Sequence, residues 1–370
     1  MKVGCVKEIK NNEFRVGMTP DNAKEYALHG HRVFVEKGAG EGSGFTDGAY
    51  IAAGAVVVDS AADVWAESDM IIKVKEPLES EYLLMRENQI IYTYLHLAAA
   101  KSLTFAMLGS KCRGVAYETL REKDGSLPLL APMSQIAGRL SVIEGAKYME
   151  KPFGGSGLLI SGVPGVKNAK VVILGGGVVG TNACKLALGI GADVTVMDVS
   201  LARLSLLDDI FGGRVKTVYS TSASIENELS DADLVIGAVL IPGATAPKLI
   251  KKSMLPKMQK GSVLVDVAVD QGGCSETTHA TTHEAPTYEV DGVLHYCVAN
   301  MPGAVAHTAT KALTNATLKY GLMIADLGLE DAARKDAAVL SAINVYRGAC
   351  TCQGVSDAFG ISCSRVASLM

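Results

Sequence analysis

Short hydrophobic runs rich in β-branched residues alternate with helix-forming segments over residues 2–119. Strands are predicted at 2–9, 31–38, 55–59, 70–77, 89–97 and 112–119. The first intervening segment, TPDNAKEYALHG, predicts a helix with Thr19 as its N-cap, Pro20 at its first position and Gly30 just past its end. Strands that alternate with helices form parallel βαβ units, so this stretch predicts a doubly wound sheet.

A second alternating region begins at AKVVILGGGVVG. Its strands are predicted at 169–174, 193–198, 215–220, 232–240, 261–270 and 294–303. Residues 132–151 and 304–328 show helical periodicity and predict two long helices, while the glycine-rich and proline-containing stretch 152–166 predicts a loop or short hairpin.

The predicted fold class is therefore α/β. We expect two doubly wound Rossmann-like domains with a deep cleft between them, joined by the long helices. The first domain is discontinuous, with residues 1–128 and 306–370, and would carry the substrate. The second comprises residues 129–305 and would bind a nucleotide.

Composition narrows the possible functions. The chain has 370 residues, of which 48% are hydrophobic and 20% charged, with a formal net charge of -4. These values predict a globular protein of about two domains with no basic surface for nucleic acid. No hydrophobic run approaches the roughly 20 residues that cross a bilayer, and charges interrupt the first ten residues where a signal peptide needs a hydrophobic core. We expect a cytoplasmic protein, and its eight cysteines, which show no paired spacing, to be reduced thiols.

The segment VVILGGGVVG places Gly175, Gly177 and Gly180 in GxGxxG spacing between a predicted strand and a predicted helix. In this context Gly175 permits the tight turn, Gly177 lets the backbone approach a pyrophosphate, and Gly180 allows close packing of helix and strand. The next strand ends at Asp198, where a carboxylate can bind the adenosine ribose. A carboxylate there would repel a 2′-phosphate, so the pattern favours NAD over NADP, with Arg203 nearby as the opposing feature.

Titratable residues end several predicted strands. Lys75, His96 and Glu118 do so in the first domain and Asp270 in the second, while Arg15 lies just past the first strand. Ligands bind at the carboxyl ends of strands in open α/β sheets.

Each of these residues also has a structural interpretation. Lys75, Glu118 and Arg15 could be solvated surface charges, Asp270 could cap a turn, and His96, in the hydrophobic run QIIYTYLHL, could be a core histidine. As a set they suit amino-acid or oxo-acid redox chemistry, because a guanidinium binds a carboxylate, an ammonium polarises a carbonyl, and an imidazole transfers protons near neutral pH. We expect His96 to be partly buried, which would lower its pKa.

The segments KEIKNNEFRVGMTP, KVKEP, YLHLA, PMSQIAGRLS, LGGGVVGTNA, VDVAVDQGG and VANMPGAVAHTAT together resemble the L-alanine dehydrogenase family along nearly the whole chain. The resemblance implies reversible NAD-dependent conversion of L-alanine to pyruvate and ammonium, and a homohexamer. It also implies that Arg15 and Lys75 bind the substrate, that His96 is the general acid/base, and that Asp270 is a second catalytic residue.

The resemblance further implies a set of cofactor-binding positions besides the three glycines. These are Ser134, Val178, Val179, Asp198, Arg203, Ser220, Val239, Leu240, Val267, Ala268, Val269, Asp270, His279, Val298, Ala299, Asn300 and Met301. His279 stands where members of the family commonly have an arginine, a change that could weaken cofactor binding or make it depend on pH.

We predict no metal site. His279 and His283 are four residues apart but lie in the loop-like THATTH, and YGLMIADLG lacks the Glu and His pair that binds metal in some relatives.

Three other functions stay open: the NAD-binding component of a transhydrogenase, a dehydrogenase for another small amino acid, and a catalytically silent NAD-binding sensor. A transhydrogenase component does not require Arg15, Lys75 and His96 together, and their joint presence argues against it.

Overall fold

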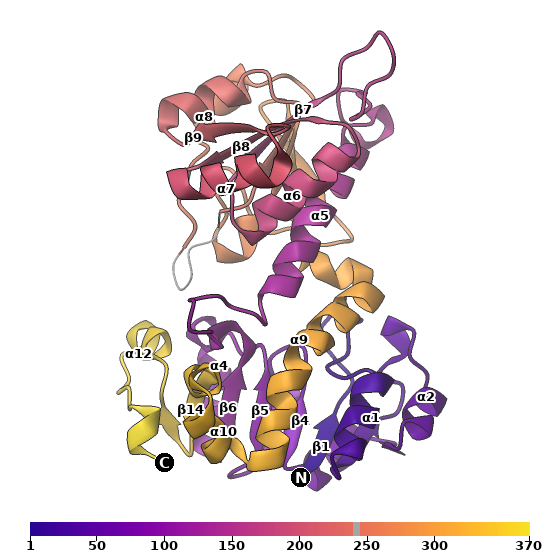
Figure 1. The fold of residues 1–370 in the computed structure, drawn as a ribbon, viewed down its shortest axis with the longest axis vertical. Coiled ribbons are helices and arrows are strands. Elements are labelled where there is room, and N and C mark those ends of the chain that lie inside the picture. Colours follow the sequence, from indigo (N-terminus) through magenta and orange to yellow (C-terminus); the bar gives the residue numbers. More distant parts are fainter. Residues whose placement is uncertain (240–244) are drawn as a thin grey trace. The chain divides into compact units, whose positions relative to one another are not determined.

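The computed structural model describes residues 1–239 and 245–370, which form two compact units. Unit 1 consists of Met1–Met133 and Val305–Met370, and unit 2 of Ser134–Ala304. The chain leaves unit 1 within the long helix α5 (Ala131–Tyr148) and re-enters it at the end of the 3-10 helix η8 (Met301–Val305). The first unit is thus assembled from both ends of the chain (Figure 1).

Unit 1 is built on an eight-stranded sheet in the order β15-β14-β6-β5-β4-β1-β2-β3. Its strands are β1 (Lys2–Cys5), β2 (Arg32–Glu36), β3 (Val56–Val58), β4 (Met70–Ile72), β5 (Ile90–Thr93), β6 (Arg113–Ala116), β14 (Ile343–Tyr346) and β15 (Ala349–Cys350). Strands β1 to β6 are parallel, whereas β14 is antiparallel to β6 and to β15. The two C-terminal strands were not among the predicted elements.

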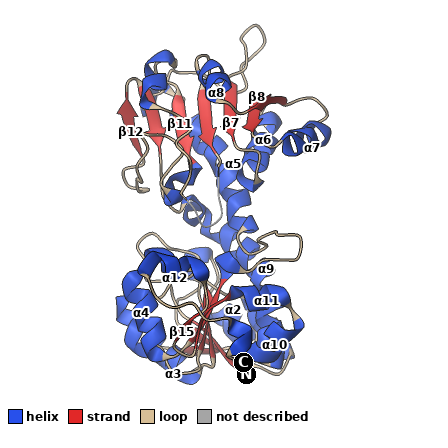
Figure 2. Ribbon diagram, turned by 90° about the vertical axis from the view of Figure 1, so that its left-hand side faces the viewer, coloured by secondary structure: helices blue, strands red, loops and turns tan. Residues whose placement is uncertain are grey.

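Helices cover both faces of this sheet (Figure 2). They are α1 (Pro20–Leu28), α2 (Asp47–Ala52), α3 (Ala61–Glu67), α4 (Lys101–Ser110), α9 (Ala306–Leu327), α10 (Leu329–Lys335), α11 (Ala337–Ala342) and α12 (Gln353–Phe359). One hydrophobic core joins the sheet to α1, α2 and α9 to α11, and the other joins it to α3, α4 and α12. Because both faces are covered, the central strand β5 is buried at every position, which is why it reads as a continuous hydrophobic run.

Helix α1 confirms the local prediction made from its sequence. Thr19 is the N-cap and accepts a hydrogen bond from the Asn22 N–H, and the Asn22 side chain accepts one from the Thr19 N–H, which completes a capping box. Pro20 occupies the first position, and Gly30, with φ of +83°, follows the helix end.

Unit 2 contains a seven-stranded sheet in the order β12-β13-β11-β10-β7-β8-β9, parallel except for the β12–β13 hairpin. Its strands are β7 (Lys170–Leu174), β8 (Asp193–Asp198), β9 (Lys216–Tyr219), β10 (Leu234–Gly237), β11 (Val263–Asp266), β12 (Thr287–Val290) and β13 (Val293–Tyr296). The helices α6 (Val178–Gly189), α7 (Leu201–Phe211) and α8 (Ser222–Leu229) connect the parallel strands on one side of β10, with the 3-10 helix η6 (Lys252–Lys257) before β11. The two sheets confirm the predicted α/β class.

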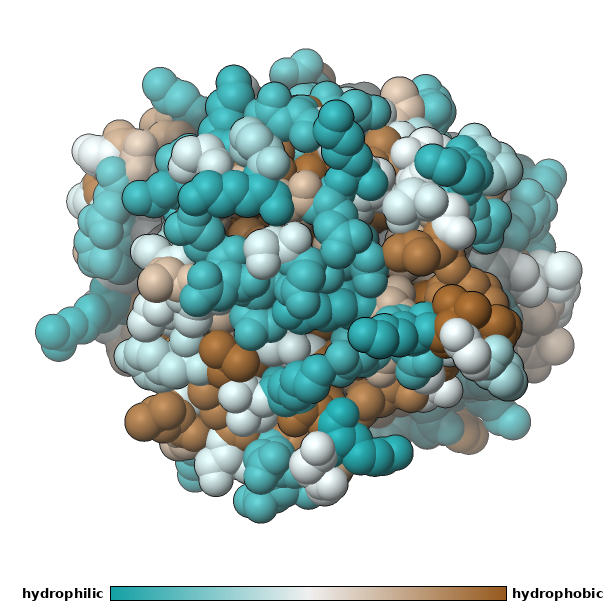
Figure 3. Space-filling model, turned by 90° about the horizontal axis from the view of Figure 1, so that it is seen from above, coloured by the Kyte–Doolittle hydropathy of each residue, from teal (hydrophilic) through white to brown (hydrophobic). Residues whose placement is uncertain are grey.

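Polar side chains dominate the face seen in Figure 3, where the hydrophobic side chains form separate groups. Within residues 1–239 and 245–370, no helix is long and hydrophobic enough to cross a membrane. All eight cysteines are free thiols, and six of them are buried.

Candidate active site

The loops that follow four adjacent strands of unit 1 carry the predicted substrate-binding and catalytic residues. Strands β1, β4, β5 and β6 are neighbours in the sheet and run parallel. Arg15 follows β1, Lys75 follows β4 and His96 follows β5, while Glu118 follows β6 in the 3-10 helix η4 (Tyr117–Thr119). Since carboxyl ends of parallel strands share one edge, this topology gathers the four side chains at one edge of the sheet.

Arg15 is fixed by Glu13, two residues before it in the same loop. The guanidinium donates from Nε to Glu13 Oε1 at 2.6 Å and from Nη2 to Oε2 at 2.5 Å, a bidentate pair in which both side chains are almost fully buried. Burial tends to raise the pKa of Glu13, but its hydrogen bonds to Arg15 and the charges of Arg15 and Lys75 hold that pKa below its usual value. Glu13 is therefore ionised and sets the plane of the guanidinium.

Lys75 lies close enough to this pair to be coupled to it electrostatically. Burial lowers the pKa of Lys75, and the positive charge of Arg15 lowers it further, while Glu13 opposes the shift. Among these three side chains, two cations face one carboxylate, so the group itself has one excess positive charge. A small molecule with a single carboxylate would neutralise that charge.

Buried carboxylates also hold the backbone beside Lys75. Glu8 Oε1 accepts hydrogen bonds from the N–H groups of Val74, at 2.6 Å, and Lys75, at 3.2 Å. The fully buried Lys73 ammonium lies 3.3 Å from Glu8 and 3.0 Å from Glu81, so one cation is paired with both carboxyl groups. The position of Lys75 thus depends on residues from the segments that follow β1 and β4.

His96 adopts a left-handed backbone conformation, with φ of 48° and ψ of 35°. Glu118 stabilises this conformation, because its Oε1 accepts a hydrogen bond from the His96 N–H at 2.7 Å and both of its oxygens lie 3.2 Å from the Leu95 nitrogen. The His96 side chain is exposed. The expectation that His96 is partly buried is therefore wrong: the hydrophobic strand ends before it, and the left-handed turn directs the residue out of the core.

Tyr94 links the histidine to the rest of the site. Its ring stacks on the His96 ring, with 5.9 Å between centroids and 11° between planes, and its hydroxyl donates to the Leu129 carbonyl at 2.6 Å. Tyr94 is buried and lies near enough to Arg15 for their charges to interact. Tyr94 and Glu13 were not predicted as site residues. Glu118 was among the predicted strand-end residues, but no role was assigned to it.

In unit 2, the predicted glycine-rich loop connects β7 to α6. Gly175 has φ of +102°, and Gly177 is the N-cap of α6, with no atom within 4 Å of where a Cβ would stand. A Cβ on Gly180 would lie 1.8 Å from the Gly175 carbonyl oxygen, so the helix can pack this closely only without a side chain there. The open space at Gly177, beside unpaired N–H groups of the first turn, fits a pyrophosphate.

Asp198 ends β8 next to this loop. Its Oδ2 accepts a hydrogen bond from the Gly176 N–H at 2.7 Å, and its Oδ1 accepts one from the Ser200 N–H at 2.8 Å. Arg203 donates from Nε to the Gly176 carbonyl and from Nη2 to Thr181 Oγ1. Both charged side chains therefore contact the glycine loop through Gly176. Asp198 ends the second strand of the sheet, the position from which an acidic residue can bind the ribose of a dinucleotide.

Asp270 differs from its predicted setting. Strand β11 ends at Asp266, and Asp270 is an exposed residue of the following 3-10 helix η7 (Val267–Gln271). The buried Asp266 caps this helix, because its Oδ1 accepts from the Ala268 N–H and its Oδ2 from the Cys274 N–H. The tight turn, rather than the strand, sets the direction of Asp270.

The other predicted cofactor positions are distributed over unit 2. Ser134 is on α5, Val178 and Val179 are in the first turn of α6, Ser220 follows β9, and Val239 follows β10. Leu240 lies outside the described residues. Val298 to Met301 follow β13, and His279 lies in a loop, where its ring stacks on Tyr288 with 4.0 Å between centroids.

Unit 2 has a glycine loop after its first strand and an acidic residue at the end of its second strand. Unit 1 carries an arginine, a lysine and a histidine in the loops that follow its parallel strands. The chain is thus a two-unit α/β protein of the doubly wound class. Models of one family match both units: Alanine dehydrogenase/PNT, N-terminal domain, over residues 4–137, and Alanine dehydrogenase/PNT, C-terminal domain, over residues 141–353. The chain belongs to this alanine dehydrogenase/PNT family.

Relatives support the same family over the whole length. The alanine dehydrogenase of Halomonas elongata is 52% identical over 370 residues and covers 100% of both chains, and that of Methanococcus maripaludis is 55% identical over 97% of this chain and 96% of its own. Among solved structures, an L-alanine dehydrogenase has a TM-score of 0.95 at 53% identity, covering 97% of this chain and 99% of its own. A transhydrogenase from Sinorhizobium meliloti has a TM-score of 0.83 at 28% identity, covering 95% and 100%.

Proposed function

We propose that this chain catalyses the reversible NAD-dependent oxidative deamination of L-alanine, in which L-alanine, NAD⁺ and water give pyruvate, ammonium, NADH and a proton. Its family, its full-length relatives named alanine dehydrogenase, and the site of unit 1 support the proposal. The observation that carries it is the buried Glu13–Arg15 pair beside Lys75, which leaves one excess positive charge for a monocarboxylate at the strand edge where His96 also lies.

In the proposed mechanism Arg15 and Lys75 bind the substrate. The guanidinium, oriented by Glu13, binds the carboxylate, and the Lys75 ammonium polarises the carbonyl oxygen of pyruvate. His96 transfers protons to and from the amino group and the attacking water, and Asp270 orients water or ammonia as the carbinolamine forms and breaks down. The carboxylate of Glu118 keeps the His96 backbone in place during these steps.

NAD fits the residues of unit 2. The helix N-terminus at Gly177 would hold its pyrophosphate and Asp198 its adenosine ribose, with Ser134, Ser220, His279 and the segments after β10, β11 and β13 as the remaining contacts. When bound, the nicotinamide supplies the acceptor for the hydride from the alanine Cα. We further propose a cytoplasmic homo-oligomer, a hexamer by resemblance to the family.

The alternative transhydrogenase function has the weaker support. The transhydrogenase from Sinorhizobium meliloti shares the fold at 28% identity, against 53% for the L-alanine dehydrogenase structure. The combination of Arg15, Lys75 and His96 suits a reaction on a small oxo-acid, which a hydride exchange between two nucleotides does not need.

The test follows NADH absorbance with L-alanine and NAD⁺, and in reverse with pyruvate, ammonium and NADH. We expect turnover in both directions, and a loss of about 10²- to 10⁴-fold in kcat for His96→Ala, with the variant folding normally because the side chain is exposed. Glycine, L-serine and 2-aminobutyrate serve as competing substrates. No turnover of any small 2-amino acid would overturn the proposal.

A further inference from the structure

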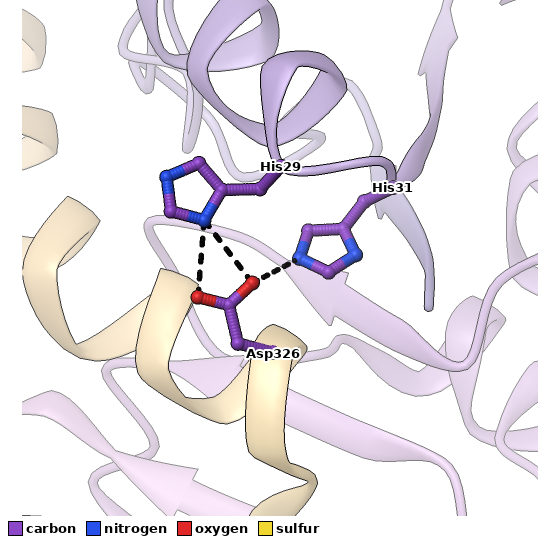
Figure 4. A group of neighbouring side chains, drawn as sticks. All are labelled: His29, His31 and Asp326. Carbon is purple, nitrogen blue, oxygen red and sulfur yellow. Dashed lines mark hydrogen bonds and ion pairs between the residues drawn. The ribbon is translucent and has the colours of Figure 1, made fainter.

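Three potential metal ligands meet on unit 1, away from the loops that carry Arg15, Lys75 and His96. His29 follows the last residue of α1, His31 lies just before β2, and Asp326 is in the last turn of α9 (Figure 4). One ligand atom from each lies within 4.8 Å of the other two. The His29 and Asp326 side chains are 42% and 35% exposed and His31 is 6% exposed, so an ion from solvent can reach the cluster.

The turn after α1 brings both imidazoles to the same carboxylate. The His31 N–H donates to the Tyr26 carbonyl at 3.0 Å and the Gly30 N–H to the Ala27 carbonyl at 2.9 Å, the pattern of a Schellman motif. Gly30 takes the left-handed conformation that this motif requires, with φ of +83°. The backbone thus fixes the relative positions of the two histidines before any ligand binds.

Close packing of α1 on α9 brings Asp326 to this turn. Tyr26 and Ile324 belong to the same buried core, and a Cβ on Gly321 would lie 2.1 Å from the Tyr26 hydroxyl. The glycine therefore permits a short separation between the two helices. The packing of the two helices fixes the position of the Asp326 carboxylate beside the histidines, which are about 300 residues away in the sequence.

The distances are close to those of a coordinated ion. His29 Nδ1 lies 3.1 and 3.0 Å from the two Asp326 oxygens, and His31 Nε2 lies 2.9 Å from Oδ1. Bonds of ~2.05 Å in a tetrahedral zinc site put neighbouring ligand atoms about 3.3 Å apart. A shift of a few tenths of an ångström, which exposed side chains can make, would open the space for the ion.

The charges also favour a cation. The Asp326 carboxylate lies within hydrogen-bond distance of both imidazoles, and a bound cation would take the place of the hydrogen between the carboxylate and each ligating nitrogen. The other groups around His31 are the amino group of Met1, 3.2 Å from Nδ1, and the Tyr26 ring.

We propose that His29, His31 and Asp326 form a binding site for a divalent transition-metal ion of the Zn²⁺ or Ni²⁺ type, with water in the remaining coordination positions. Two imidazoles and one carboxylate are a donor set that suits these ions, whereas Mg²⁺ and Ca²⁺ prefer oxygen ligands alone. The site replaces our expectation from the sequence that the chain has no metal site.

The ion would have a structural role. His31 precedes β2, whereas Arg15, Lys75 and His96 follow their strands, so the cluster lies at the opposite edge of the sheet of unit 1. Bound metal would join the α1–β2 turn to the end of α9 and so connect the N-terminal and C-terminal segments of unit 1. This inference does not depend on the proposed function.

The test is calorimetric titration of metal-stripped full-length chain, without a histidine tag, with ZnCl₂, NiCl₂ and MgCl₂. A Cys352→Ser, Cys363→Ser background removes the two thiols that are not buried. We expect one Zn²⁺ or Ni²⁺ per chain, no Mg²⁺ binding, and at least about 10-fold weaker binding in His29→Ala and in Asp326→Asn. His283→Ala, which removes a histidine outside the cluster, should bind as the background does.

Thermal unfolding gives a second measurement. At a free concentration 100 times the Kd, the ion should raise the unfolding midpoint by about 5 °C in the background and not in His29→Ala, while turnover without metal stays the same in both. Absence of Zn²⁺ and Ni²⁺ binding in the background would overturn the proposal. Equal binding in His29→Ala and Asp326→Asn would also overturn it.

Discussion

Glu118→Ala tests how His96 is held for catalysis. The Glu118 carboxylate accepts hydrogen bonds from the N–H groups of two successive residues, Leu95 and His96, from the end of the neighbouring strand. Alanine removes both acceptors and leaves the His96 side chain itself unchanged. The substitution therefore separates the position of the imidazole from its chemistry.

The expected magnitude follows from two opposing contributions. Each hydrogen bond to a charged acceptor contributes about 2 kcal/mol, so the pair gives about 4 kcal/mol. The left-handed conformation of His96 costs about 1.5 kcal/mol. The difference of about 2.5 kcal/mol holds nearly every molecule in the observed conformation. Without the acceptors only the strain remains, and about one molecule in ten keeps that conformation, since ~1.4 kcal/mol corresponds to tenfold.

We therefore expect Glu118→Ala to lower kcat about 10-fold in the NADH absorbance assay. The KM for L-alanine should change little, because Arg15 and Lys75 lie on other loops. Glu118→Gln keeps one carbonyl oxygen, worth about 1 kcal/mol per hydrogen bond, and should retain more than half of kcat. Thr119→Val is the matched control: it removes a hydrogen bond to Asn344 from the same 3-10 helix without touching Leu95 or His96.

The comparison of the two Glu118 variants decides the question. A kcat within twofold of wild type for a folded Glu118→Ala chain would refute the positioning role. Equal losses in the alanine and glutamine variants would also refute it, because they would mean that the negative charge acts in the reaction directly. In a positioning role, the pH profile of kcat keeps its shape in both variants.

Three further predictions concern the cofactor and the substrate. Gly177→Ala places its Cβ in open space, so it should fold normally and bind NAD about 10- to 100-fold more weakly, measured by dialysis or fluorescence. Gly180→Ala would place its Cβ 1.8 Å from a carbonyl oxygen and should lose about 1–3 kcal/mol of unfolding free energy. Equal stability of the two variants would contradict this prediction. Asp198→Asn should reduce the preference for NAD over NADP by about 1,000-fold, because a unit charge at 4 Å contributes about 4 kcal/mol at an effective dielectric constant of 20 and ~1.4 kcal/mol corresponds to tenfold. An unchanged kcat/KM ratio for the two cofactors would argue against a ribose contact. Because its pKa is lowered, Lys75 loses its charge at a lower pH than an ordinary lysine, whose pKa is ~10.5. As the pH rises, kcat/KM for pyruvate should therefore begin to fall before pH ~10.5, and Lys75→Arg should abolish this alkaline decrease. The same decrease in the variant would assign it to another group.

The sequence predicted local structure correctly where all the interacting residues lie in one short segment. Thr19, Pro20 and Gly30 bracket α1 as expected, because caps and helix ends depend on residues within a few positions of one another. The same holds for Gly175 and Gly180, whose conformation and packing are set between one strand and the next helix. Strand ends were less accurate: β11 stops at Asp266, since a capped 3-10 turn replaces the predicted continuation.

The sequence by itself therefore determined the α/β class, the glycine loop with Asp198, and the strand-end positions of Arg15, Lys75 and His96. Only the tertiary structure decided that Glu118 fixes the His96 backbone, that His96 is exposed, and that His29 and His31 meet Asp326. The physical reason is the range of the interactions. Periodicity, caps and turns are set by neighbours in the chain. Glu118 and Asp326, in contrast, reach the residues they contact because distant segments of the chain pack together. Nothing in the sequence of either segment indicates this contact.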